Sequence, residues 1–252
     1  MASRSNPCGL KVMLAMPTHR AIYPWTVQSL IKTRDAMAPW SSIHFYGPYG
    51  CSMVTTARNK VAQVFLEGKC DRLFWIDSDM VWQPSDFLRV MELSEELECV
   101  GAAYPLKSEP IRFFLDLETC ETNEWGCASA RAFGLGFACV QRKVMEELAA
   151  KAPKILLSDE TVCAKIFRTD EIATETAKRL GADAEERGED AIFFSDVRAL
   201  GYKVWIDPTI KLGHVGPKIY EGSVEDLVRL AEKEAKGAEG PPSSGQPLGG
   251  AR

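Results

Sequence analysis

Two carboxylates, Asp77 and Asp79, directly follow the apolar segment 73–76 in the order Asp-Ser-Asp. The segment predicts a buried strand, and open α/β sheets bind ligands at the carboxyl ends of their strands. Because side chains two positions apart on a strand face the same way, we expect both carboxylates to face one cation. Oxygen ligands suit Mg²⁺ or Mn²⁺ and leave coordination positions for water and a diphosphate. The alternative is a polar turn in which Asp79 caps the next helix.

Three other residues have side chains suited to chemistry. Glu189 and Asp190 stand at the start of a predicted helix, where the helix dipole alone favours acidic side chains. His214 lies in the segment KLGHVGP, which predicts a loop, and a single histidine on a loop is commonly a surface residue. Taken one at a time, these residues need no functional explanation.

Two glycines, Gly134 and Gly136, interrupt the strand-like segment GLGFACVQ just before a predicted helix. They do not form a dinucleotide-binding fingerprint, because the third glycine is missing and the segment lies far from the first strand. Glycines inside a strand indicate either a close approach of the backbone to a ligand or a packing bulge. The sequence leaves both interpretations open.

The first 105 residues alternate between short apolar runs and helical patterns. The predicted strands are 11–17, 41–47, 71–77 and 98–105, and the predicted helices are 24–36, 55–68 and 84–97. This alternation predicts an α/β fold with a mostly parallel, doubly wound sheet.

Beyond Pro105 the pattern changes to strand-like segments separated by loops, which predicts a mixed sheet. The strand-like segments are 111–118, 130–141 and 202–207, and the predicted helices are 142–151, about 170–181, 190–200 and 224–236. Residues 237–252 are rich in glycine, proline and serine, and we expect a disordered tail there.

Composition places the chain among ordinary globular proteins, with 46% hydrophobic and 26% charged residues over 252 positions. Its eight cysteines form no C-x-x-C pair, so we expect reduced thiols that pack in the core and no zinc site. The net charge of -5 offers no general basic field for nucleic acid. Without a membrane-length apolar run or a secretory leader, the protein is expected to be soluble and cytoplasmic.

The order of these motifs resembles the nucleotide-sugar glycosyltransferases of the GT-A fold. It comprises a first strand ending in Pro-Thr, a helix with Ala-Arg-Asn, the Asp-Ser-Asp strand end, Gly-x-Gly-Phe, Glu-Asp at a helix start, and Gly-His-Val-Gly. The resemblance spans residues 10 to about 220 and is closest to small family-two-like enzymes of bacteria and phages. It implies a Rossmann-like sheet in one domain over 1–236, with a nucleotide-sugar half (about 9–105) and an acceptor half (about 106–236).

The resemblance also implies roles for individual residues. Asp79 would bind Mn²⁺ or Mg²⁺ directly, Asp77 would lie nearer the ribose or a metal-bound water, and His214 would join the metal site. Asp190 would be the general base of a transfer that we expect to invert configuration, although some members of the fold retain it. The residues implied to contact the nucleotide sugar are Pro17, Thr18, Arg58, Asp77, Gly136 and Glu189. For Arg58, a structural salt bridge is the alternative.

The implied activity is transfer of a sugar from a UDP- or GDP-linked donor to a hydroxyl group. The first alternative is a sugar nucleotidyltransferase, although the chain lacks a glycine-rich basic loop after the first strand. The second is a catalytically inactive protein that binds a nucleotide sugar, although Asp190 favours activity.

The acceptor stays open as a glycan, a small metabolite, a protein or a hydroxylated base in phage DNA. We expect its binding parts near residues 104–125 and 152–188. Three aromatic residues there are candidates to stack on a sugar or base, namely Phe113, Phe114 and Trp125. A DNA acceptor would require a basic groove, for which the available cations are Lys107, Arg112, Arg131, Lys151, Lys154 and Lys165.

Overall fold

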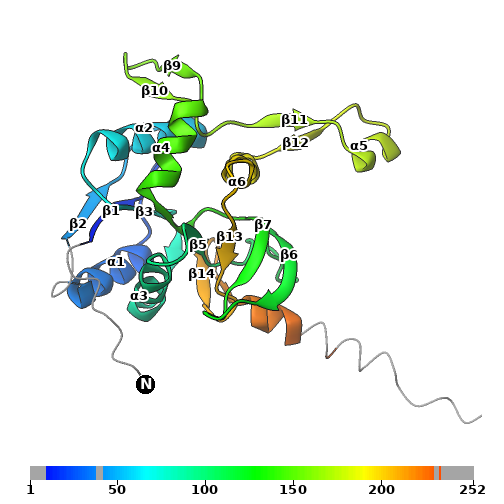
Figure 1. The fold of residues 1–252 in the computed structure, drawn as a ribbon. Coiled ribbons are helices and arrows are strands. Elements are labelled where there is room, and N and C mark those ends of the chain that lie inside the picture. The colour runs from blue at the N-terminus through cyan, green and yellow to red at the C-terminus, as the bar shows by residue number, and fades with distance from the viewer. Residues whose placement is uncertain (1–9, 38–41, 230–232, 234–252) are drawn as a thin grey trace, which may run out of the picture.

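A computed structural model describes residues 10–37, 42–229 and 233, and the architecture is organised by an eight-stranded sheet (Figure 1). Its strand order is β2-β1-β3-β8-β5-β13-β7-β6. The strands are β1 (Lys11–Ala15), β2 (Ser42–Tyr46), β3 (Arg72–Ile76), β5 (Cys99–Gly101), β6 (Leu115–Thr122), β7 (Ala128–Phe133), β8 (Phe137–Gln141) and β13 (Val204–Ile206).

The sheet is mixed, but most of its strands share one direction. Strand β1 is parallel to β2 and β3, and β5 is parallel to β13. Strand β8 is antiparallel to β3 and β5, and β7 is antiparallel to β13 and β6. Six strands therefore run one way, and β7 and β8 run the other. The predicted α/β fold, with a mostly parallel sheet that becomes mixed toward the C-terminus, is confirmed.

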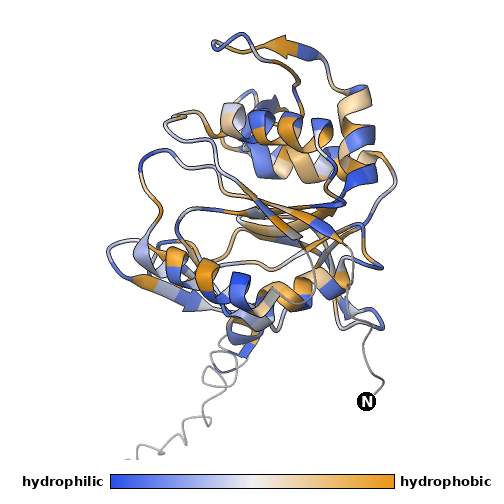
Figure 2. Ribbon diagram, turned by 90° about the vertical axis from the view of Figure 1, so that its left-hand side faces the viewer, coloured by the Kyte–Doolittle hydropathy of each residue, from blue (hydrophilic) through white to orange (hydrophobic). Residues whose placement is uncertain are grey.

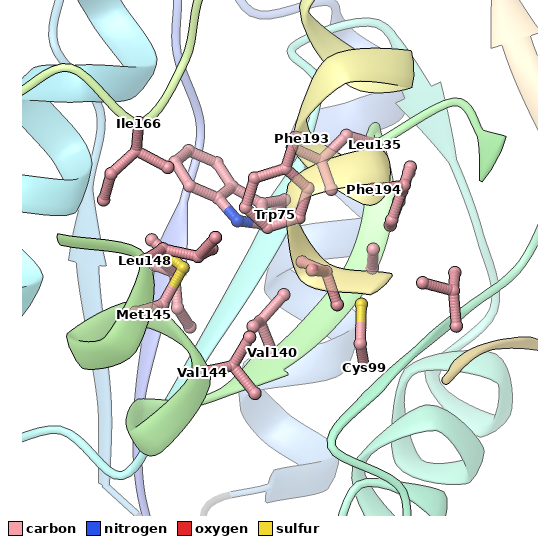
Figure 3. Packing of buried hydrophobic residues seen from close by; sticks show 14 of the residues in the cluster. Trp75, Cys99, Leu135, Val140, Val144, Met145, Leu148, Ile166, Phe193 and Phe194 are labelled. Carbon is pink, nitrogen blue, oxygen red and sulfur yellow. The ribbon is translucent and has the colours of Figure 1, made fainter. Parts of the chain in front are cut away.

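Helices cover both faces of this sheet, as Figure 2 shows in side view. Helices α2 (Val54–Glu67), α4 (Arg142–Lys151) and α6 (Glu189–Ala199) pack on one face, and α1 (Pro24–Met37) and α3 (Pro84–Leu93) pack on the other. Strand β3 is apolar throughout because it contributes alternate residues to each core. Leu73 and Trp75 join the first core, where Figure 3 shows Trp75 near Phe193, while Phe74 and Ile76 join the second.

The predicted strand at 130–141 is in fact two strands. Strand β7 ends at Phe133, and β8 begins at Phe137 on the other side of β5 and β13. Both run in the same direction, so the intervening residues 134–136 carry the chain across the sheet. Neither glycine lies inside a strand, and the bulge interpretation is therefore wrong.

A projecting arm replaces much of the helix predicted at 170–181 (Figure 1). Residues 170–172 form β11 (Asp170–Ile172), which pairs with β12 (Glu185–Arg187), and the helix shrinks to α5 (Glu175–Arg179). The helical prediction is wrong over β11 because cross-strand pairing with a distant segment decides its conformation. The strand predicted at 111–118 lies four residues further along the chain, as β6 (Leu115–Thr122). The helix predicted at 190–200 is confirmed as α6 (Glu189–Ala199).

Two small sheets complete the fold. Strand β14 (Leu212–Val215) lies between β4 (Met80–Val81) and β15 (Ile219–Gly222), and β9 (Lys154–Leu156) pairs with β10 (Val162–Ala164). Residues 224–229 are helical, as predicted for the start of the last helix, whereas the predicted tail at 237–252 lies outside the described residues.

Cysteine behaves in this fold mainly as a small core residue. All seven cysteines in the described ranges are free thiols, and five of them are buried. The buried ones are Cys70, Cys99, Cys127, Cys139 and Cys163. Within the described residues, no helix is both long and apolar enough to cross a membrane.

Buried Asn59 ties the start of the arm to helix α2, which generates a prediction about stability. Its side-chain amide donates to the Phe167 carbonyl (2.9 Å) and accepts from the Phe167 N–H (2.8 Å). Asn59→Ala should lower the free energy of unfolding by about 2 kcal/mol, because both backbone groups of Phe167 would lose their partner while buried. Urea unfolding measures this loss. Gln63→Ala, which removes an exposed contact to Glu67 on the same helix, is the control and should cost about 0.5 kcal/mol or less.

Candidate functional site

The residues predicted to do chemistry gather where three parallel strands end. Pro17 and Thr18 follow β1, Asp77 follows β3, and Tyr104 follows β5. A pocket of about 290 Å³ lies at this edge. It is lined by Pro17, Thr18, His19, Cys51, Ser52, Val54, Ala57, Arg58, Asp77, Ser78, Asp79, Tyr104, Glu189, Asp190 and His214. The carboxyl edge of the sheet is where α/β folds of this kind bind ligands.

Arg58, on α2, is the electrostatic centre of this pocket. Its side chain is only 2% exposed, and one guanidinium nitrogen, Nη2, lies 3.3 Å from Asp77 Oδ1 and 3.4 Å from Asp190 Oδ1. A third carboxylate, Glu189 Oε1, lies 3.6 Å from Nε. Burial opposes the charged form, but the three carboxylates outweigh it, so the pKa of Arg58 is raised above its ordinary value. The predicted structural salt bridge is therefore present.

Asp190 is a buried carboxylate in the first turn of α6. Its Oδ2 accepts a hydrogen bond from the Leu135 N–H at 3.1 Å, a donor outside its own helix. Burial raises the pKa of Asp190 to about 7, and the nearby charges of Glu189 and Asp77 add to the shift, although Arg58 and the Leu135 N–H oppose it. Because Gly188 is the N-cap residue, Asp190 does not cap its helix.

Gly134 and Gly136 leave space for the polar groups beside them. A Cβ on Gly136 would lie 2.6 Å from Asp77 Oδ2, and a Cβ on Gly134 would lie 2.6 Å from the Tyr104 hydroxyl. Tyr104 in turn donates to Asp77 Oδ2 at 3.4 Å, and the Asp77 N–H donates to the Gly136 carbonyl at 3.1 Å. The close approach expected of these glycines is thus made by protein side chains.

Asp79 faces a different set of partners from Asp77. Its Oδ2 accepts from Lys107 Nζ at 2.5 Å and lies 3.3 Å from His214 Nε2. Burial raises the pKa of Asp79, but its contacts with His214 and Lys107 outweigh burial and lower that pKa below its ordinary value. Asp79 does not cap α3, whose N-cap residue is Gln83.

Asp77 and Asp79 both line the first pocket, and their expected role as ligands of one cation stays a prediction. Strand β3 ends at Ile76, so the two-residue alternation of a strand does not extend to Asp79. The two carboxylates have different protein partners, because Arg58 and Tyr104 contact Asp77 whereas Lys107 and His214 contact Asp79. Within the described ranges, no three His, Cys, Asp or Glu side chains converge as a metal site.

His214 lies in strand β14 and not on the predicted surface loop. Its Nδ1 is 2.9 Å from the Pro105 carbonyl, which can only accept, so Nδ1 carries the proton. A protonated ring donates from Nε2 to Asp79 Oδ2, which is the contact that lowers the pKa of Asp79. In a neutral ring the lone pair of Nε2 faces Asp79 Oδ2 instead, and a cation between the two atoms would remove their repulsion. One carboxylate oxygen and one imidazole nitrogen, with the second ring nitrogen fixed by a carbonyl, fit the donor set of a Mn²⁺ site.

A second pocket of about 470 Å³ adjoins the first. Four residues line both, namely Tyr104, Glu189, Asp190 and His214. The remaining lining residues are Leu106, Phe114, Asp116, Ala132, Gly134, Glu185, Glu186, Arg187, Gly188 and Ala191. The shared wall therefore carries the buried carboxylate of Asp190, and a group bound in either pocket can reach it.

Most of the predicted site residues meet in these pockets. The exception is Gly136, which lies beside Asp77 and lines neither of the two pockets. Sequence reasoning gave no individual role to Tyr104 or to the contact of Lys107 with Asp79. Tyr104 had a detectable signal, because it lies near the end of the predicted strand 98–105, whereas the direction of the Lys107 side chain had none.

Comparisons with known proteins support the fold. No protein-family model and no curated protein sequence matches the chain significantly. The solved structure "A197 from STIV" is similar over 86% of this chain and 91% of its own, with a TM-score of 0.55 and 19% sequence identity. Another, 4-diphosphocytidyl-2C-methyl-D-erythritolsynthase from Anaerococcus prevotii DSM 20548, covers 75% of this chain and 99% of its own at 9% identity, but its TM-score of 0.33 carries no argument.

The Lys107 ammonium group occupies the side of Asp79 that a metal ion would need, so the two should compete. Lys107→Met should increase the affinity for Mn²⁺ without nucleotide by roughly threefold or more, because the carboxylate loses its internal cation. Electron paramagnetic resonance of free Mn²⁺ measures the change. Lys211→Met, which removes a lysine paired with Glu221 elsewhere, should change nothing. Weaker Mn²⁺ binding by the Lys107 variant would contradict the competition.

Proposed function

We propose that this protein is a metal-dependent glycosyltransferase that moves a sugar from a UDP- or GDP-linked donor to a hydroxyl group with inversion. The observation that carries the proposal is the position of Asp190, a carboxylate with a raised pKa on the wall between two adjoining pockets. The first pocket is also lined by Asp79, and His214 lines both pockets. The resemblance to GT-A enzymes and the observed α/β fold are consistent with this activity.

The donor would occupy the first pocket. Pro17 and Thr18 line it at the end of β1, where they would contact the nucleotide. Arg58 lines the same pocket, but its Nε and Nη1 atoms are buried and Nε lies 3.6 Å from Glu189 Oε1, so Arg58 would act on the donor mainly through its charge and through the carboxylates that it holds. Asp79 and His214 would hold a divalent cation, with Asp77 binding through water. When bound, that cation offsets the negative charge that develops on the leaving diphosphate.

The acceptor would bind in the second pocket with a hydroxyl group near Asp190. Asp190 would take the hydroxyl proton while the acceptor oxygen forms a bond to the anomeric carbon. The bond from that carbon to the diphosphate oxygen breaks, and its electron pair leaves with the nucleoside diphosphate. A pKa of about 7 suits this role, since about half of such carboxyl groups are ionised at neutral pH and the ionised form accepts a proton more readily than an ordinary carboxylate.

The two alternatives predict different products. A sugar nucleotidyltransferase would release pyrophosphate from a nucleoside triphosphate, and an inactive protein would bind a nucleotide sugar without turnover. We expect neither, because Asp190 lies on the wall shared by the two pockets, where a proton acceptor is needed.

Incubation with UDP-, GDP- and dTDP-sugars in the presence of Mn²⁺ should release nucleoside diphosphate and no pyrophosphate. Asp79→Ala should abolish both this release and the Mn²⁺-dependent part of nucleotide-sugar affinity, and His214→Ala should weaken them less. Calorimetry measures the affinity, and circular dichroism checks that the variants are folded. Undiminished Mn²⁺-dependent affinity in a folded Asp79→Ala protein would rule out the metal assignment.

The rate should depend on the ionisation of Asp190. Because burial raises the pKa of Asp190 to about 7, the carboxyl group is mostly protonated at pH 6 and cannot accept a proton, so the rate should rise with pH, reach half its maximum near pH 7 and level off about one unit above that pKa. Asp190→Asn should reduce turnover by at least ~10² and remove this limb of the pH profile. Nucleotide-sugar affinity should change little. Near-wild-type turnover in this variant would show that Asp190 is not the base.

A further inference from the structure

The second pocket has a chemical character that bears on the acceptor. It opens between the loop after β5, the end of β7 and the arm strand β12, and its volume of about 470 Å³ lies within the ordinary range for small-molecule sites. None of the six cations considered for a DNA acceptor lines it. Two of them are in ion pairs. Lys107 contacts Asp79, and Arg131 pairs at 2.8 Å with Asp116, which is itself a lining residue of this pocket.

Carboxylates dominate the polar lining of this pocket. Five acidic residues line it, namely Asp116, Glu185, Glu186, Glu189 and Asp190. Only three arginines contact them: Arg58, Arg131 and Arg187. Arg58 is also shared with Asp77, and within the described chain Glu186 forms no ion pair. The negative charge is therefore in excess, and like-charge repulsion disfavours a phosphate or carboxylate on the ligand.

Apolar side chains provide a complementary surface in the same pocket. Phe114 is 42% exposed and Leu106 is 38% exposed, and both lie on the loop between β5 and β6. Phe113 and Trp125, the other aromatic candidates, do not line this pocket. An exposed ring beside several hydrogen-bond acceptors suits a ligand that has an apolar C–H face and many hydroxyl donors.

We propose that the acceptor is an uncharged carbohydrate, which places its C–H face on Phe114 and donates hydroxyl hydrogen bonds to the carboxylates of this pocket. The inference rests on the proposed function and specifies its acceptor. Each carboxylate can accept hydrogen bonds from neighbouring hydroxyl groups without a cation. An anionic acceptor would have to compete for Arg187, the one arginine or lysine among the lining residues, which is already paired with Glu185. A nucleic-acid acceptor is therefore disfavoured.

The experiment compares ligands that are matched in size and differ in one charge. Methyl pyranosides of the gluco, galacto and manno configurations are tested against the methyl glycosides of the corresponding uronic acids, which carry a free carboxylate, by saturation-transfer NMR on the full chain without donor. At least one neutral glycoside should bind, with an affinity at least about tenfold higher than that of its uronate. Phe114→Ala should weaken this binding at least roughly threefold.

A charge reversal tests the electrostatic part of the argument. Glu186→Lys should reduce the preference for the neutral glycoside by roughly threefold or more, whereas Glu124→Lys, on the exposed turn between β6 and β7, should leave it unchanged. Equal or tighter binding of the uronate would overturn the proposal, and so would the absence of binding by all neutral glycosides.

The two proposals fail in different ways. Release of nucleoside diphosphate by a protein that binds no neutral glycoside would overturn the acceptor class and leave the transferase activity standing. Glycoside binding without any release from the donor panel would overturn the transferase activity and leave the pocket assignment standing.

Discussion

The arrangement of the site depends on a single buried cation, the guanidinium group of Arg58. A charge with 2% exposure is costly to keep out of water unless anions surround it, and here three carboxylates from two segments of the chain surround it. Helix α2 supplies the arginine, the end of β3 supplies Asp77, and the start of α6 supplies Glu189 and Asp190. Since removal of Arg58 would leave these carboxylates without their shared cation, the three elements must meet at one point. The same cluster keeps two carboxylates close to Asp190 and so contributes to its unusual basicity.

Much of the fold follows from patterns that are local in sequence. The alternation of apolar runs and helical segments up to Pro105 is sufficient to predict strands β1, β2, β3 and β5, because each buried parallel strand must be apolar on both faces. The arm could not be predicted in the same way. Residues 170–172 form a strand only because residues 185–187 pair with them, and this pairing cannot be predicted from the composition of residues 170–172. Likewise, the chain crosses the sheet at residues 134–136 because β13, far along the sequence, inserts between β5 and β7.

In the candidate site, too, the positions of residues could be predicted from local sequence patterns, whereas the directions of their side chains could not. Side chains at strand ends and helix starts can be placed near one another from the order of elements alone, and Pro17, Thr18, Asp77 and Asp190 do line one pocket. The direction of each side chain depends on turn geometry and distant partners. Asp77 and Asp79 therefore have different protein partners, although a strand pattern would give them a common one, and His214 gains its surroundings from β4 and Pro105. Tertiary contacts of this kind leave no periodic signal in a single sequence.

The arm has a consequence for how such a protein can diversify. Strands β11 and β12 form a sheet of their own, and β12 contributes Glu185, Glu186 and Arg187 to the second pocket just before the chain enters α6. Loops of this type tolerate changes in length and composition at small thermodynamic cost. Substitutions in the arm can therefore alter ligand preference while the main sheet, its two cores and the Arg58 cluster stay intact. Selection can therefore act on the lining that the arm contributes separately from the residues that build the Arg58 cluster.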